Sequence, residues 1–246
     1  MSQILKIEAI VLSKINYGDT SIIVNLFTKE KGRLTAIVKG ARSPKSKMGS
    51  IVDPLNYLSV IIYNKDTRDV QLISGADIIA HYPRIKEDYD KLQYAYAVLE
   101  LTKSLIPDHE TNERLFKGIV RILELYNSSN NHSGILFGRF FLFFLEVIGY
   151  EFQIDKCYSC GEIDLQQKDL AYNFDLGILC SNCKNEHIQS FFLDAELFHL
   201  FFCLKHNEKI ENMKVETINK ALGYLEKYLR YHVPDFKGLS SLQLFK

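Results

Sequence analysis

The sequence predicts an α+β protein in two parts: a small five-stranded barrel over residues 1–80, then an α-helical bundle domain over residues 81–246. Three observations support this. Short runs of β-branched and aromatic residues, separated by turn residues, fill the first part. After Arg84 the apolar residues recur at the spacing typical of helices. Two Cys-x-x-Cys pairs interrupt the helical part and indicate a metal-binding insertion at about residues 153–190.

Five segments of the first part are predicted to be strands, because each is rich in Ile, Val, Tyr or Phe and ends at turn residues. They are Ile4–Leu12, Ser21–Phe27, Arg33–Lys39, Tyr57–Tyr63 and Val70–Ser74. In the third, alternation by two places Leu34, Ala36 and Val38 on one face and the cations Arg33 and Lys39 on the other. The segment Gly40–Gly49 is too polar and too broken for an element, so we expect a mobile loop at the edge of the barrel.

Positive charge is concentrated between Lys29 and Lys47, where seven cations face a single anion, Glu30. A charge run of this kind is often only a solvated loop. Next to a five-stranded barrel, however, it matches the oligonucleotide-binding (OB) fold, in which a cationic groove follows the nucleic-acid backbone. The candidate DNA-binding residues are Lys31, Arg33, Lys39, Arg42, Lys45 and Lys47.

Four aromatic residues of the predicted barrel could stack on bases: Tyr17, Phe27, Tyr57 and Tyr63. For any single one of them a place in the barrel core is the favoured interpretation, because aromatic side chains readily fill small barrels. The cations are therefore the stronger candidates for contact with nucleic acid.

Five helices are predicted in the second part from apolar residues at helical spacing. Two amphipathic helices meet near Pro107, and a third, at about Ile135–Ile148, is apolar nearly all round and should form the buried centre of the bundle. Two more follow the cysteines: one with Asp194 as its N-cap, and one over about Met213–His232.

The most specific motif is Cys157-x-x-Cys160 followed, after nineteen residues, by Cys180-x-x-Cys183. This spacing is typical of a tetrahedral zinc site, and the segments Leu170–Phe174 and Gly177–Leu179 between the pairs form a predicted hairpin. Four thiolates leave no open coordination position, so we expect structural Zn²⁺. Four reduced cysteines without metal are the alternative, and His187 is a conceivable but less favoured ligand.

The composition and the absence of several motifs exclude some classes of function. Thirty basic residues balance thirty acidic ones, so any polyanion-binding surface must be local. No apolar run is long enough to span a bilayer, so we expect a cytoplasmic protein that does not bind membranes. The Gly-Lys dipeptide of phosphate-binding loops is absent, as are Gly-x-Ser-x-Gly and His-Glu-x-x-His. We therefore expect a protein that is not an enzyme.

Three segments resemble the N-terminal domain of the RecO family of bacterial recombination mediators. They are Glu8–Leu12, Tyr17–Leu34 and Val38–Ser43, which include Tyr-Gly-Asp, Thr-Lys-Glu-Lys-Gly and Val-Lys-Gly-Ala-Arg. The resemblance extends in outline over the whole chain. Asp19 stands where many members have Glu, and some members lack the cysteines, so zinc is not essential to the family's function.

The resemblance implies DNA repair and recombination. A RecO-like protein is expected to bind single- and double-stranded DNA, to anneal complementary strands and to associate with the nucleoid. With RecR it would help to load RecA onto DNA coated by single-stranded DNA-binding protein. The acidic, apolar C-terminal tail of that coating protein would require an apolar groove with a cationic rim, for which Arg114, Lys117, Arg121 and Arg139 are candidates, although pairing with nearby glutamates is the simpler interpretation.

Two other function classes stay open. One is a metal-dependent nuclease or other phosphoesterase that uses the barrel to bind its substrate, since catalytic acids can lie far apart in sequence. The other is a factor that reads structured RNA through the barrel. Metal-dependent product formation would identify the first, and competition between single-stranded DNA and folded RNA would identify the second.

Overall fold

The computed structural model describes residues 3–65, 67–163, 170–184 and 190–243. These residues form two compact units. Unit 1 contains the described residues up to Asn131 together with those from Leu239 onward, and unit 2 contains His132–Gly238. No helix in the described part of the chain is long and apolar enough to cross a membrane.

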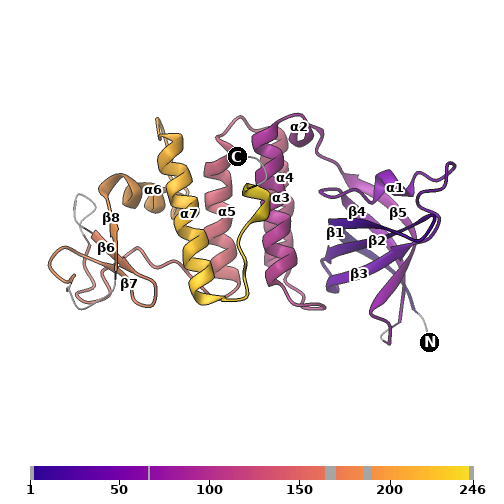
Figure 1. Ribbon diagram of the computed structural model, residues 1–246, viewed down its shortest axis with the longest axis horizontal. Coiled ribbons are helices and arrows are strands. Elements are labelled where there is room, and N and C mark those ends of the chain that lie inside the picture. The colour runs from indigo at the N-terminus through magenta and orange to yellow at the C-terminus, as the bar shows by residue number, and fades with distance from the viewer. Residues whose placement is uncertain (1–2, 66, 164–169, 185–189, 244–246) are drawn as a thin grey trace. The chain divides into compact units, whose positions relative to one another are not determined.

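Unit 1 begins with a closed barrel of five strands, which confirms the predicted fold class (Figure 1). The strands are β1 (Gln3–Tyr17), β2 (Ser21–Thr28), β3 (Gly32–Val38), β4 (Tyr57–Asn64) and β5 (Val70–Ala80). Their order around the barrel is β1-β2-β3-β5-β4. The β3–β5 pair is parallel and the other pairs are antiparallel, as expected of an OB-fold barrel.

The barrel core consists mainly of side chains from every second residue of each strand. On β3 the side chains of Leu34, Ala36 and Val38 are buried, as predicted, while Arg33 is only partly buried and Lys39 is exposed. The other strands contribute inward-facing aliphatic residues of the same kind, including Ile7, Ala9, Val11, Ile22, Val24, Leu26, Leu58, Val60, Ile62 and Ile73. Burial of this apolar surface drives closure of the barrel and leaves its outer face for contacts.

Strand β1 is longer than predicted and pairs with two neighbouring strands. Residues Gln3–Ile10 pair with β4, and residues Ala9–Tyr17 pair with β2, with a register shift between Val11 and Ser13. Such a bulge bends a strand, and it allows one strand to close a small barrel. The strand therefore continues to Tyr17, at the turn before β2.

After the barrel, unit 1 continues with α2 (Pro83–Lys86), α3 (Tyr89–Leu105) and α4 (Glu113–Ser128). The Asp88 carboxylate accepts a hydrogen bond from the Lys91 amide at 3.0 Å and caps α3, and the Asn112 side chain caps α4 in the same way at 2.8 Å. The ring of Phe116 on α4 packs against Phe27 of the barrel, with ring centroids 6.0 Å apart.

The segment between α3 and α4 lies against the start of β3, and Gly32 permits this close approach. Gly32 has φ +64°, and a Cβ atom built there would lie 2.2 Å from the backbone oxygen of Glu110.

We expect Gly32→Ala to lower the free energy of unfolding by about 2 kcal/mol or more, because a strained backbone is combined with a steric clash. Urea denaturation measures this. Gly18→Ala is the matched control, since Gly18 has φ +54° but no atom within 4 Å of its Cβ position; an equal loss in both variants would contradict the steric account.

Unit 2 is built on α5 (Ser133–Val147), α6 (Ala195–Lys205) and α7 (Val215–His232). Helix α5 is buried nearly all round, as predicted, and Asp194 caps α6 by accepting a hydrogen bond from the Leu197 amide at 2.8 Å. A small antiparallel sheet, β7-β6-β8, consists of β6 (Leu170–Asn173), β7 (Gly177–Leu179) and β8 (Phe191–Leu193). The predicted hairpin is thus confirmed, and β8 is an additional third strand.

The predicted domain boundary at residues 80 and 81 falls at the end of β5, the last strand of the barrel, just before α2. The compact units divide the chain elsewhere, because α2, α3 and α4 belong with the barrel. Whether residues 1–80 fold without these helices therefore stays a prediction. In sequence the chain leaves unit 1 after Asn131 and returns to it at Leu239, where a short 3₁₀ helix, η1 (Ser240–Leu242), follows.

Candidate nucleic-acid interface and metal centre

The loop after β3 carries the exposed cations of the predicted DNA-binding set. Lys39, Lys45 and Lys47 are exposed, and none of their ammonium groups has an ion-pair partner among the residues that the structure describes. A short helix, α1 (Met48–Ile51), follows the loop. Because these three charges are not neutralised by neighbouring carboxylates, they give this end of the barrel a positive surface.

Arg42 fixes the loop to the turn between β1 and β2. Its backbone amide donates to the carbonyl oxygen of Thr20 at 2.8 Å. Its guanidinium donates to the carbonyl oxygens of Asp19 at 2.8 Å and of Ser21 at 3.3 Å, and also to that of Gly18. All of these acceptors are neutral, so Arg42 holds the two loops together and still contributes its positive charge to the surface.

Arg33 is placed differently from the other predicted cations. Its guanidinium lies 3.0 Å from the Asp108 carboxylate and donates to the carbonyl oxygen of Lys103 at 2.6 Å. Its own carbonyl accepts a hydrogen bond from the His109 amide at 2.9 Å. The side chain is therefore committed to the α3–α4 segment, so the structure does not bring Arg33 together with the loop cations. Lys31 is partly buried at the β2–β3 turn, where its amide donates to the hydroxyl of Thr28 at 3.0 Å.

We expect Arg33→Ala to destabilise unit 1 by about 1–3 kcal/mol, because it leaves Asp108 and the Lys103 carbonyl without their charged partner. The midpoint of urea unfolding tests this, with Lys45→Ala as the exposed, unpaired control. A larger loss of stability in the control than in Arg33→Ala would contradict the structural role of Arg33.

Two of the four cations predicted on the helices are paired with glutamates. The ammonium group of Lys117 lies 2.9 Å from the carboxylate of Glu113, and the guanidinium of Arg121 lies 3.7 Å from that of Glu124. These two residues therefore form the ion pairs with nearby glutamates that were the simpler interpretation of the sequence. Both pairs are exposed and contribute little to stability. In unit 2, Arg139 donates to the backbone oxygen of Glu208 at 2.5 Å.

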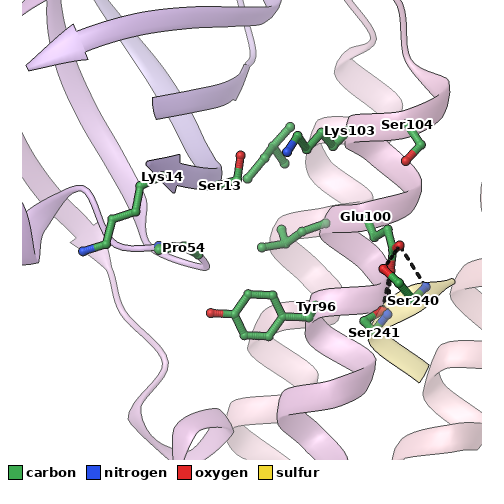
Figure 2. A pocket seen from close by; sticks show the side chains of 11 residues that line it. Ser13, Lys14, Pro54, Tyr96, Glu100, Lys103, Ser104, Ser240 and Ser241 are labelled. Atoms are coloured by element: carbon green, nitrogen blue, oxygen red, sulfur yellow. Dashed lines mark hydrogen bonds between the residues drawn. The ribbon is translucent and has the colours of Figure 1, made fainter. Parts of the chain in front are cut away.

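A groove of about 700 Å³ lies in unit 1 between the barrel and α3 (Figure 2). Its apolar lining includes Leu12, Pro54, Tyr96 and Leu99, and its charged side chains are Lys14, Glu100 and Lys103. The Lys14 ammonium lies 2.5 Å from Asp53, so part of its charge is already neutralised.

The carboxylate of Glu100, at the edge of this groove, holds the returning C-terminal segment. It accepts hydrogen bonds from the amide and hydroxyl of Ser240 at 2.9 and 2.5 Å, and from those of Ser241 at 2.9 and 2.6 Å (Figure 2). Burial alone would raise the pKa of Glu100, but these hydrogen bonds outweigh burial and lower it. No sequence signal indicated this contact, because its partners are 140 residues apart.

The pKa of Glu100 predicts the pH dependence of this attachment. A depressed pKa in the folded state means that the stabilising effect is full above the ordinary carboxyl pKa and is lost as pH falls through the lowered value. We therefore expect that acidification below about pH 4 lowers the free energy of unfolding more in the wild-type protein than in the Glu100→Gln variant. Urea midpoints at pH 7 and pH 3.5 test this, and an identical loss in both proteins would contradict it.

The four predicted metal ligands come together in unit 2. The Sγ atoms of Cys157, Cys160, Cys180 and Cys183 all lie within 4.8 Å of one another, and those of Cys160 and Cys180 are 3.8 Å apart. Four sulfurs at about 2.3 Å from a central zinc ion would be about 3.8 Å apart, so the cluster has the size of a tetrahedral thiolate site. The donor set therefore fits a metal ion. His187 lies outside the described residues.

Local backbone geometry builds each pair of ligands. In the first, Gly161 has φ +79° and donates to the Cys157 carbonyl at 2.9 Å; in the second, the Cys183 amide donates to the Cys180 carbonyl at 3.0 Å. The Tyr158 amide donates to the carbonyl of Ile178 at 2.8 Å, which ties the first pair to β7. The hairpin therefore brings the two pairs together, as the spacing predicted.

The protonation of the thiols favours a cation in this cluster. Burial opposes ionisation of Cys157, but backbone amides of Cys160, Cys180 and Ser159 lower its pKa to about 6. The hydrogen bond from Cys183 to Cys180 instead raises the pKa of Cys183 to about 12. The Cys157 thiol therefore ionises more readily than that of Cys183, and a divalent cation would stabilise all four thiolates together.

The cysteine hairpin rests on an aromatic cluster that is internal to unit 2. The ring of Phe152 stacks on Tyr172 of β6 with centroids 4.4 Å apart, and Phe174 contacts the edges of Tyr224 and Tyr228 on α7. These contacts connect the order of the hairpin to the packing of α7.

Comparisons with known proteins agree with this architecture. The sequence model of the family "Recombination protein O N terminal" matches residues 1–82, and that of "Recombination protein O C terminal" matches residues 86–241. The chain is 29% identical to the DNA repair protein RecO of Chloroherpeton thalassium, covering 98% of each chain. It is 28% identical to that of Alkaliphilus metalliredigens over 99% of each chain, and 33% identical to that of Chlorobium phaeobacteroides over 72% of this chain and 67% of the relative.

The two family models together span the OB-fold barrel, the helices and the cysteine hairpin. The resemblance found in three N-terminal segments is thereby confirmed for nearly the whole chain. This protein belongs to the RecO family of DNA repair and recombination proteins.

Proposed function

We propose that this protein is a non-catalytic recombination mediator that binds single- and double-stranded DNA and anneals complementary strands. The observation that carries the proposal is the group of exposed, unpaired lysines after β3, namely Lys39, Lys45 and Lys47. Arg42 joins their loop to the β1–β2 turn, so the charges belong to one end of the barrel. Lys31 is the further candidate, whereas Arg33 serves mainly to hold the α3–α4 segment.

Backbone contacts suit annealing better than base-specific contacts. Two strands can pair only if their hydrogen-bonding edges stay accessible, so phosphate contacts must supply most of the affinity. Each phosphate contact to a single strand contributes about 0.7 to the slope of log affinity against log salt. Lysine side chains on a surface loop are suited to this, because they bind phosphate as point charges without reading sequence.

We propose that the metal of the cysteine cluster is Zn²⁺ and that its role is structural. Cys157, Cys160, Cys180 and Cys183 would fill all four positions of a tetrahedron, and this leaves none for a water or substrate. Bound zinc would supply the crosslink that holds the two halves of the hairpin together. The protein's own residues form the aromatic support of that hairpin.

The proposed partners follow from the family: RecR, single-stranded DNA-binding protein and, indirectly, RecA. The acidic and apolar tail of the coating protein requires an apolar groove with cations at its rim. In unit 1 the groove lined by Leu12, Pro54, Tyr96 and Leu99 is largely apolar, and Lys103 is the lining cation that would contact the tail, because Lys14 is paired with Asp53. Work on coated DNA would place the protein at the nucleoid in the cytoplasm.

Annealing of complementary oligonucleotides coated with single-stranded DNA-binding protein, with no nucleotide added, tests the proposal. We expect wild type to accelerate annealing and Lys103→Glu to lose the acceleration on coated strands while it retains that on bare strands. A metal-dependent nuclease would instead cleave the strands, and a structured-RNA factor would prefer folded RNA as competitor.

A further inference from the structure

We propose that the exposed ring of Tyr17, together with Ile15 beside it, is the surface on which this protein stacks single-stranded nucleobases. The inference rests on the proposed DNA binding and deepens it, because it separates the residue that contacts bases from the residues that contact phosphates.

Burial distinguishes Tyr17 from the other three aromatic residues of the barrel. Phe27 is fully buried against Phe116, and the ring of Tyr57 also packs on Phe116 while its hydroxyl donates to Glu8. Tyr63 is half-buried on β4. Tyr17 is 56% exposed and has neither a ring partner nor a hydrogen-bond partner in the described part of the chain.

Strand register places Tyr17 at the end of an apolar strip on the outer face of the barrel. Ile15, two residues before Tyr17 on β1, shares its face and is 58% exposed. Ile15 pairs with Ile23 on β2, and Ile23 pairs with Ile37 on β3. The inward-facing neighbours on β2 are Ile22 and Val24, so this row points outward.

Arg42 attaches the loop that carries the cations to the end of this strip. The turn that follows Tyr17 begins at Gly18, and Arg42 donates to carbonyl oxygens throughout that turn. Lys39 comes directly after Val38, which pairs with Ile22 of β2. The only acidic side chain in the turn is that of Asp19, which is exposed. A strand whose phosphates contact the loop lysines would therefore have bases within reach of Tyr17.

The chemistry of stacking predicts which nucleic acid Tyr17 recognises. Every base has an aromatic face, so stacking is tolerant of sequence, but a duplex hides those faces between neighbouring pairs. Tyr17 should therefore favour single strands over duplex, whereas the lysines should act on both. Stacking on one face of a base also leaves its pairing edge open, as annealing requires.

Substitutions at Tyr17 separate stacking from charge. We expect Tyr17→Ala to weaken binding of an oligothymidylate of about twenty nucleotides by about 5- to 100-fold and to leave duplex affinity and the salt slope unchanged. Tyr17→Phe should bind as wild type does, because it keeps the ring. Tyr89→Ala, which removes a comparably exposed tyrosine at the start of α3, is the matched control and should have no effect.

The chain contains no tryptophan, so Tyr17→Trp would give the full-length protein a single fluorescent reporter at the proposed site. We expect oligothymidylate to quench its emission saturably, with the same midpoint as binding measured independently.

The inference is overturned if Tyr17→Ala binds the oligonucleotide as wild type does and the reporter emission does not change, while reversal of the loop lysines still weakens binding. In that case the proposed DNA-binding function stands and only the stacking surface is wrong. If reversal of the lysines has no effect either, both proposals fall.

Discussion

Reversing Lys39, Lys45 and Lys47 to Glu should reduce the affinity for single-stranded DNA by at least about 100-fold at low salt and should lower the magnitude of the salt slope by about 2. Three lost phosphate contacts at about 0.7 each give that change in slope. Duplex affinity should fall as well, because phosphates are common to both. Fluorescence anisotropy with labelled oligonucleotides at several salt concentrations measures both quantities.

The control for this triple variant changes the same amount of charge elsewhere. Lys214, Lys227 and Lys237 are exposed in unit 2, and their reversal to Glu gives the protein the same net charge. We expect that control to keep most of the affinity and the slope. Equal losses in the two triple variants would show that net charge alone controls binding, and the assignment to the loop would then be wrong.

Replacing Cys180 by Ser should reduce the metal content from about one zinc per chain to nearly none and should disorder the hairpin. Structural zinc contributes about 10–16 kcal/mol of apparent binding free energy in small zinc domains. Zinc binding is therefore the largest single contribution that we assign to the stability of unit 2. The rings of Tyr172 and Phe152 stack at the base of the hairpin, so near-UV circular dichroism should lose intensity.

The fifth cysteine supplies a matched control for the metal prediction. Cys203 is buried on α6, outside the cluster, and Cys203→Ser should retain full metal content. DNA affinity should survive in Cys180→Ser, because the loop lysines belong to unit 1. Retention of metal by Cys180→Ser, or a wild-type protein that binds no zinc, would contradict the proposed site.

Local pattern was sufficient to predict most elements of the fold. Alternation on β3 and the two-residue gap within each Cys-x-x-Cys pair are both local patterns, and the structure confirms the predictions made from them. The extension of β1 to Tyr17 was missed because Lys14 and Asn16 make that half of the strand polar. Strand β8 has only three residues, which is too few for a periodic signal.

The long-range partners of the candidate site could not be predicted from sequence. Lys45 and Arg33 look equivalent in a charge run, but Arg33 contacts Asp108, which is 75 positions further along the chain. The Ser240 amide contacts Glu100 across a separation of 140 residues. The sequence therefore predicts which cations could belong to the positive surface, whereas tertiary contacts decide which of those cations remain unpaired.

Annealing of bare complementary strands, with no nucleotide and no added divalent ion, tests the central claim most directly. The account predicts that wild type accelerates annealing, that strand length is unchanged on a denaturing gel, and that the Lys39/Lys45/Lys47 reversal abolishes the acceleration. Annealing at the spontaneous rate with wild type, or cleavage of the strands, would contradict it.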